Sequence, residues 1–300
     1  MNCYRILNRR GLSFLVSIFL YNSVSFGIEP FVKTKLISDH TMVTANDSIR
    51  IGILFTIPKG YHIYWQNPGD AGLQPTVDIN YPEEFKTGPL QWPLPDQLEE
   101  AGGLKVNVYR GEVLLYTKVL TPVKFQEASV SLRANLEWMV CKETCVLEKS
   151  SLDLTIPFSK KSEYNETAKM IFNWYEKLVP RSIQEYPYLS ISSDIIKPEN
   201  KKNNTVIREI HIKSLDLNNT FMLTGDTIQW FNGTVDNAMV ETVSFDQRKS
   251  NAQLLIFRLE TKKIGKQGDI KSNSWGVVKF RMKMDNDTVL QHGLILSGLN

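Results

Sequence analysis

Cysteine and histidine are scarce in this sequence, which has three cysteines and four histidines among its 300 residues. So few cysteines exclude a small scaffold held together by disulfides. A zinc site needs four ligands, and the histidines are not spaced as ligand pairs: His40, His62, His211 and His292. With 42% hydrophobic and 22% charged residues, the composition also excludes a collagen or a disordered chain. The length is sufficient for one large or two modest folded domains.

Long apolar runs are absent except near the N-terminus, over residues 12–20. Three arginines precede this run, small residues follow it at 25–27, and residues 1–27 contain no acidic residue. The run is shorter than the roughly 20 residues that a helix needs to span a bilayer. This pattern predicts a cleaved signal peptide over residues 1–27, and therefore an exported protein.

An excess of either charge is also absent once this segment is removed. Loss of its three arginines leaves 32 basic and 32 acidic residues in the mature chain. A neutral chain does not favour a nucleic-acid partner, which is bound by an excess of Lys and Arg. Cleavage also removes Cys3, so Cys141 and Cys145 are the cysteines of the exported chain, in a compartment where disulfides persist.

Residues 28–160 have the pattern of short strands separated by Gly and Pro turns. Apolar residues alternate with others in three stretches: 49–55, 132–140 and 152–156. The segment Asn67–Gly72 is rich in turn formers and is expected to be a loop. Because no long helical period interrupts this region, we predict an antiparallel β-sandwich.

Residues 161–180 predict a connecting helix, since apolar residues recur at helical spacing until Pro180. Asn165 or Ser162 is the expected N-cap. The stretch 181–205 is rich in Pro, Asn and Lys and is interpreted as loop and linker. Strand patterns then return at 206–212, 220–223, 253–259, 275–284 and 290–296. We therefore predict a second, smaller β-domain within residues 181–300, for which the sequence indicates no role.

The cysteine pair is the feature of the sequence most closely linked to chemistry. Cys141 and Cys145 lie between two alternating stretches, so we expect them at or near the tip of a β-hairpin. Residues flanking such a tip come within the roughly 4.4–6.8 Å between Cα atoms that a disulfide needs. A bond that closes so short a loop stabilises a fold by only about 2 kcal/mol, against roughly 4.7 kcal/mol for a 100-residue loop. A bond that opens and closes explains the pair better than a structural one.

Two alternatives remain open at this point: a structural disulfide, and a Cu(I) site made of the two thiolates and Met139. If the pair exchanges, Lys142 favours the thiolate of its neighbour Cys141 and Glu143 opposes it, so both are candidates for modulating the cysteine pKa. Trp138 is expected to shield the sulfurs from non-specific oxidants.

Four motifs, taken in order along the chain, resemble a known family: Gly60–Gly72, Gln91–Pro93, Tyr109–Leu114 and Trp138–Cys145. They are similar to the N-terminal periplasmic domain of thiol:disulfide interchange reductases of the DsbD type, especially the ScsB-like branch. The resemblance covers residues 35–160. It implies an immunoglobulin-like sandwich in which Cys141 and Cys145 form the redox-active pair.

The resemblance also implies partners and a periplasmic location. In the family, the pair takes electrons from a membrane-embedded or thioredoxin-like domain and passes them to periplasmic disulfide proteins. This chain has neither donor domain, so we expect the donor to be a separate polypeptide, and we expect no cofactor. Tyr61, Tyr64 and Trp65 are then candidates for shielding the cysteines or docking a partner, although turn formation and core packing explain their segment better.

A different class of function competes with this one. A non-catalytic immunoglobulin-like module with a structural disulfide would dock a partner or bind Cu(I) through the same residues. The redox potential of the pair distinguishes the two, because structural disulfides have potentials below about −300 mV.

Overall fold

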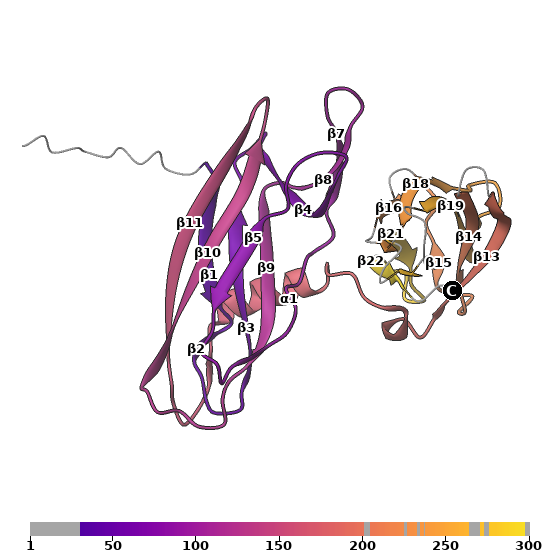
Figure 1. Cartoon of the computed structure of the whole chain (residues 1–300). Coiled ribbons are helices and arrows are strands. Elements are labelled where there is room, and N and C mark those ends of the chain that lie inside the picture. The colour runs from indigo at the N-terminus through magenta and orange to yellow at the C-terminus, as the bar shows by residue number, and fades with distance from the viewer. Residues whose placement is uncertain are drawn as a thin grey trace, which may run out of the picture.

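The computed structural model describes residues 31–200, 205–224, 227–232, 235–236, 238–263, 271–272 and 276–297. The predicted signal peptide and Cys3 lie outside the described residues. Two β-units lie side by side, and a helix and a connecting segment link them (Figure 1). The elements that position the cysteine pair all belong to the first unit.

The first unit is a sandwich of two antiparallel sheets. One sheet has the order β1 (Lys33–Ser38), β3 (Ser48–Thr56), β9 (Glu112–Leu120) and β6 (Lys86–Thr87). The other has the order β11 (Cys145–Pro157), β10 (Ser129–Cys141), β4 (His62–Gly69), β8 (Lys105–Tyr109) and β7 (Asp96–Glu99), with β5 (Thr76–Asn80) also pairing with β10. A separate small pair consists of β2 (His40–Met42) and β12 (Glu163–Tyr164).

The core of this unit lies between the two sheets, where alternate side chains of each strand are buried. β3 and β10 supply ten of these side chains: Ile49, Ile51, Ile53, Phe55, Val130, Leu132, Ala134, Leu136, Trp138 and Val140. On the other face of β10, the residues between them are mostly exposed or half-buried. The antiparallel sandwich predicted from the alternation is therefore confirmed.

The predicted helix is present as α1 (Glu166–Glu176). Asn165 caps it, because the side-chain oxygen of Asn165 accepts a hydrogen bond from the backbone nitrogen of Ala168 at 3.2 Å. The helix packs on the outer face of the β1–β9 sheet, where the ring of Phe172 meets Tyr116 at 5.6 Å between centroids. It thus covers the sandwich as well as connecting the two units.

The second unit also consists of two antiparallel sheets, entered through a short 3-10 turn, η1 (Ile183–Glu185). One sheet has the order β13 (Leu189–Asn200), β14 (Thr205–Ser214), β19 (Leu254–Lys263) and β18 (Ala238–Phe245). In the other, β21 (Gly276–Lys283) pairs with β15 (Thr220–Phe221), β16 (Gln229–Asn232) and β22 (Val289–Leu296). A minor pair is β17 (Val235–Asp236) with β20 (Lys271–Ser272).

The interpretation of residues 181–205 as linker is wrong for its second half, which forms β13. The turn-forming composition was misleading because β13 is an edge strand, and edge strands tolerate proline. Pro198 falls where the pairing with β14 loses its regular register, between Lys197 and Asn200. Proline has no backbone N–H, but at position 198 the regular hydrogen bonding between β13 and β14 is already interrupted.

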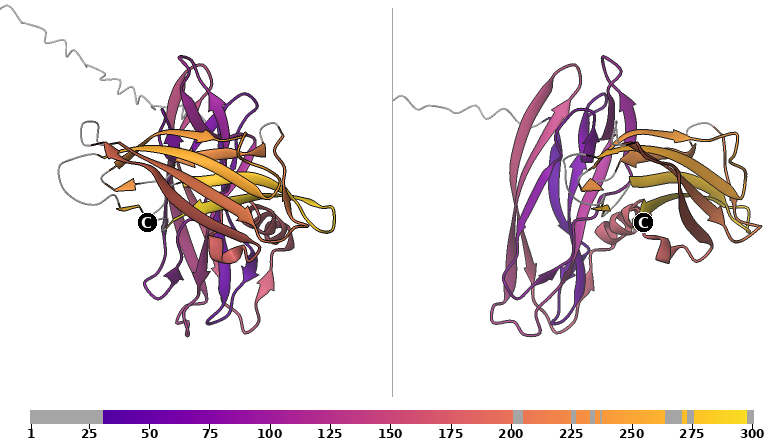
Figure 2. Two further views of the ribbon diagram at one scale, coloured as in Figure 1. Left: turned by 90° about the vertical axis from the view of Figure 1, so that its right-hand side faces the viewer. Right: turned by 45° about the vertical axis from the view of Figure 1, so that its right-hand side comes forward.

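The second unit lies against one side of the first (Figure 2). Buried side chains of both units belong to one apolar cluster. Phe231 of β16 is fully buried against Trp65 of β4, with 5.5 Å between the ring centroids. Beside this contact, the side-chain amide of Asn67 donates a hydrogen bond of 2.7 Å to the backbone oxygen of Asn232. The second unit is therefore seated on the strand that contains the Gly60–Gly72 motif.

Candidate redox site

The cysteine pair closes the hairpin formed by β10 and β11. Cys141 and Cys145 are the last pair of the ladder, and they form a disulfide with 4.1 Å between their Cα atoms. The three-residue loop between them is held by a hydrogen bond of 3.2 Å from the nitrogen of Lys142 to the oxygen of Thr144. The expected position at a hairpin tip is confirmed.

The two sulfurs have different surroundings. Cys141 is 1% exposed and packs with Tyr64, Val106 and Val108, whereas Cys145 is exposed. The difference follows from the sheet order, since β10 lies inside the sheet and β11 lies at its edge. A partner molecule therefore reaches the disulfide from the side of Cys145.

A chain of polar groups begins at the buried sulfur. The hydroxyl of Tyr64 lies 3.2 Å from Sγ of Cys141 and donates to Oε1 of Glu100, also at 3.2 Å. The same Oε1 atom lies 3.1 Å from Nε2 of His62. His62 is paired with Cys141 in the ladder between β4 and β10. The series of polar groups therefore begins at Cys141 and ends at the residue paired with it.

The protonation states in this chain follow from burial. Burial and the neighbouring Glu100 raise the pKa of Tyr64 to about 12, so its hydroxyl keeps its proton at neutral pH. Burial lowers the pKa of His62, which outweighs the opposite effect of Glu100, so the ring is neutral at pH 7. Tyr64 therefore presents a hydroxyl that can donate toward a thiolate at Cys141 or accept from its thiol.

The Gly60–Gly72 motif places Tyr64 through a strand and a tight turn. The segment Asn67–Gly72 is not entirely a loop as expected, because β4 continues to Gly69, with a register shift after Tyr64. The chain then folds back over Tyr64 at Gly72, which has a φ of +95°. A Cβ atom at Gly72 would lie 2.2 Å from Cε1 of Tyr64, so only glycine permits this contact.

Trp138 is not beside the sulfurs. It is 1% exposed in the core of the sandwich, packs edge-on against Phe55, and donates from Nε1 to Oε2 of Glu148 at 3.0 Å. Strand alternation explains this placement, because Trp138 and Cys141 are three positions apart and therefore face opposite sides of β10. Trp65 likewise lies in the core, under Phe231 of the second unit. The structure thus places both tryptophans in packing roles.

Tyr61, Lys142 and Glu143 lie at the hairpin tip, on the side away from the sulfurs. Tyr61 is half-buried, stacks on Phe31 at 5.6 Å between ring centroids, and has Nζ of Lys142 5.6 Å above its ring. Lys142 and Glu143 are exposed in the loop. Together with Phe31 and Val146, these residues line a small cavity of about 250 Å³.

Sequence reasoning missed Glu100 entirely, although a buried histidine such as His62 usually has a hydrogen-bond partner. The structure gives His62 that hydrogen bond and makes Glu100 its partner. Glu100 follows β7, and pairing of β7 with β8, and of β8 with β4, brings it to the cysteine. Glu100 and Tyr64 are 36 positions apart in the sequence, and two strand pairings bring them together. The sequence around Glu100 contains no pattern that indicates this contact.

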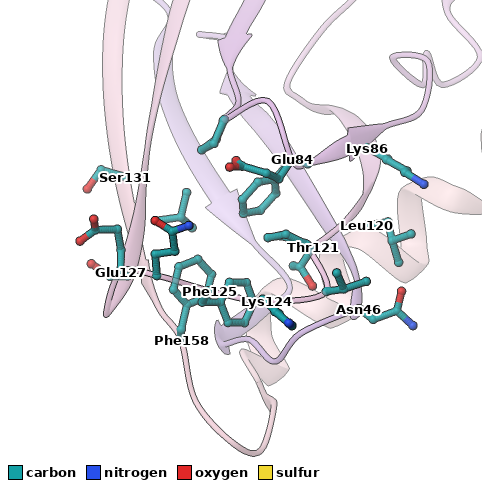
Figure 3. Close-up of a pocket in the computed structure, with 17 residues that line it drawn as sticks. Asn46, Glu84, Lys86, Leu120, Thr121, Lys124, Phe125, Glu127, Ser131 and Phe158 are labelled. Atoms are coloured by element: carbon teal, nitrogen blue, oxygen red, sulfur yellow. The ribbon is translucent and has the colours of Figure 1, made fainter.

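A larger cavity lies elsewhere in the described part of the chain. It has a volume of about 760 Å³ and is lined by Phe85, Phe125 and Phe158 among other residues (Figure 3). It contacts the first residues of β10, whereas Cys141 is the last residue of that strand, so it lies at the opposite end of the sandwich. The disulfide is therefore not located in this cavity.

Two further findings concern the described residues. They contain no group of three or more His, Cys, Asp and Glu side chains arranged to hold a metal ion. None of their helices has the length and apolar character needed to cross a membrane. Met139 does pack beside Cys141, on the same face of β10.

Comparison with known proteins agrees with this site. The crystal structure of the N-terminal periplasmic domain of ScsB from Proteus mirabilis is similar, with a TM-score of 0.53 and 15% identity over 88% of this chain and 93% of that chain. The sporulation control protein Spo0M from Bacillus subtilis matches with a TM-score of only 0.21 and 8% identity, over 67% of this chain and 78% of that chain. A search of curated proteins gave no match. Residues 32–157 match the family described as "Thiol:disulfide interchange protein DsbD, N-terminal".

Proposed function

We propose that this protein is an exported, periplasmic thiol:disulfide interchange protein in which Cys141 and Cys145 alternate between dithiol and disulfide. The observation that supports this most directly is the asymmetry of the pair. One sulfur is exposed at a hairpin tip, and the other is buried against a protonated hydroxyl. A bond that served only the fold would not need either feature.

The reaction proceeds by two exchanges. In the reduced protein, the thiolate of Cys145 attacks one sulfur of a partner's disulfide, whose S–S bond breaks and whose leaving thiolate takes up a proton. The thiol of Cys141 then loses its proton, and its thiolate attacks Sγ of Cys145 and releases the second partner sulfur. The partner gains two electrons and two protons, and the pair becomes a disulfide. A separate thiol donor reduces it again.

Tyr64 and Glu100 support the second exchange. The hydroxyl of Tyr64 is the hydrogen-bond partner of Sγ of Cys141 and is itself connected to Glu100. As the proton leaves, the O–H of Tyr64 turns from Glu100 to Sγ and donates to the developing thiolate. The turn is favoured because hydrogen bonds to a charged group are stronger than those to a neutral one. In this scheme Cys145 exchanges with partners and Cys141 resolves the mixed disulfide.

Single cysteine variants test this scheme. Reduced Cys141→Ala is expected to form a stable mixed disulfide with a disulfide-containing peptide, because Cys145 attacks and nothing resolves the product. Reduced Cys145→Ala is expected to form little, since the remaining sulfur is buried. The adducts are counted by mass spectrometry without reductant. Equal trapping by the two variants contradicts the assigned roles.

The competing function, a non-catalytic module with a structural disulfide, predicts a different result. Its bond has a redox potential below about −300 mV, and mild thiols leave it intact. The potential of the wild-type pair, measured in thiol buffers, separates the two functions. A value below that limit, together with no adduct in either variant, rules out interchange.

A further inference from the structure

The outer face of the cysteine hairpin is polar except beside the sulfurs. The residues that share this face with Cys145 along β11 are Leu147, Lys149, Ser151, Asp153 and Thr155, and all of them are exposed. The residues that share it with Cys141 along β10 are Met139, Glu137, Asn135, Arg133 and Ser131. In both strands, the one apolar residue is therefore the one next to the cysteine.

Met139 and Leu147 are directly opposite each other in the ladder, two pairs inward from the disulfide, with the Val140–Val146 pair between. Leu147 is 48% exposed. Beyond them, Glu137 and Lys149 form an ion pair of 2.5 Å that ends the apolar surface. We call Cys145, Met139 and Leu147 the hairpin patch. Its apolar part is confined to the immediate neighbourhood of the exposed sulfur.

The outer edge of β11 beside the patch pairs with no other strand among the described residues, and the nearby backbone nitrogens of Phe31 and Val32 bond to the side chain of Glu148 instead. β11 is the terminal strand of its sheet, and within the described residues its ladder partner is β10 on one side only. The backbone N–H and C=O groups on the other side of Cys145–Leu147 therefore face outward. An extended segment can pair with such an edge, with every second side chain turned to the same face.

We propose that the hairpin patch binds an extended segment of a partner protein, in which a bulky apolar side chain lies close to the reacting cysteine. The segment runs along the outer edge of β11, and the apolar side chain covers Leu147 and Met139. Such a contact removes Leu147 from water, which favours binding in proportion to the apolar area buried. A hydrophilic small disulfide such as oxidised glutathione gains nothing from the patch. This inference rests on the proposed function.

Two matched disulfide peptides test the inference with the full-length reduced protein. They have one sequence, except that a position beside the cysteine is Leu in one peptide and Ser in the other. Wild type is expected to reduce the leucine peptide roughly five- to tenfold faster, which corresponds to the burial of part of one leucine side chain. Leu147→Ser is expected to lose this preference, which the ratio of the rates with the two peptides measures independently of any change in overall rate.

Leu290→Ser is the matched control, because Leu290 is 45% exposed and lies in the second unit on β22. It is expected to keep the full preference. A third peptide, the leucine peptide with two methylated backbone nitrogens, is expected to lose most of its advantage because it cannot pair with the edge of β11.

Three results overturn the proposal. Equal rates for the leucine and serine peptides with wild type overturn the hairpin patch alone, while the proposed function stands. Full activity of the methylated peptide overturns the pairing along β11. Failure of wild type to reduce any of the disulfides, oxidised glutathione included, overturns the proposed function and the inference with it.

Discussion

At the scale of single residues, Tyr64 connects the redox pair to the rest of the protein. Its side chain is 1% exposed, and its hydroxyl lies at 3.2 Å from both the sulfur of Cys141 and a carboxylate oxygen of Glu100. Removal of the hydroxyl takes away the group that stabilises a thiolate at Cys141 but changes little of the packing. The resulting effect belongs to the second exchange, in which Cys141 attacks.

We predict that Tyr64→Phe slows resolution of the mixed disulfide about tenfold, which corresponds to the loss of one hydrogen bond to a charged group, worth about 1.5 kcal/mol. The mixed disulfide at Cys145 then accumulates, and quenched-flow mass spectrometry measures it. Tyr81→Phe is the control, since the buried hydroxyl of Tyr81 has no hydrogen-bond partner among the described residues. An unchanged lifetime of the mixed disulfide in Tyr64→Phe contradicts this role.

At the scale of elements, strands with one buried face could be predicted from the sequence, and others could not. β3 and β10 alternate because the sandwich buries every second side chain. β13 and the end of β4 were missed, because proline and asparagine there indicate turns and only the partner strands override that tendency. The cysteine pair was found because a hairpin is local. Glu100 was not, because tertiary pairing alone brings it to Tyr64.

The strand β22 contains a histidine whose titration affects stability. His292 packs against the rings of Tyr186, Tyr188 and Phe280, and Nε2 of His292 has no hydrogen-bond partner in the described part of the chain. Burial, with a smaller effect of the nearby Arg181, lowers the pKa of His292 to about 4. Between pH 4 and pH 6.5, the unfolded state therefore binds more protons than the folded state.

We predict that the stability of the second unit is greatest above about pH 6.5 and falls as the pH is lowered toward 4. His292 accounts for up to about 3 kcal/mol of this loss, since each unit of pKa shift corresponds to 1.36 kcal/mol. His292→Phe is expected to flatten the dependence, as measured by urea unfolding at pH 7 and pH 4.5. The same slope in wild type and variant excludes this explanation.

At the scale of the whole molecule, the two units are held together by a shared apolar contact. Phe231 and Val277 of the second unit belong to the same buried cluster as Trp65 and Trp92 of the first. A phenylalanine buried on both sides in this way stabilises the interface and each of the two cores. Truncation of Phe231 leaves a cavity next to Trp65. The fluorescence of Trp65 is therefore expected to change.

We predict that Phe231→Ala costs about 3 kcal/mol of stability, the usual effect of truncating a buried phenylalanine, and separates the unfolding of the two units into two transitions. Urea unfolding followed by tryptophan fluorescence and by circular dichroism measures both effects. Phe245→Ala, in the second unit and only half-buried, is the control and is expected to keep a single transition. If Phe231→Ala unfolds in one transition and loses less stability than Phe245→Ala, the two units are not coupled through Phe231.

β4 serves two purposes with eight residues. His62 and Tyr64 belong to the surroundings of the buried sulfur, while Trp65 and Asn67 seat the second unit. A designer who transfers the cysteine hairpin to another sandwich must therefore also transfer this strand, and with it an apolar surface that needs a cover. The same arrangement restricts which amino acids β4 can contain, because residues that surround the buried sulfur stand directly beside residues that seat the second unit.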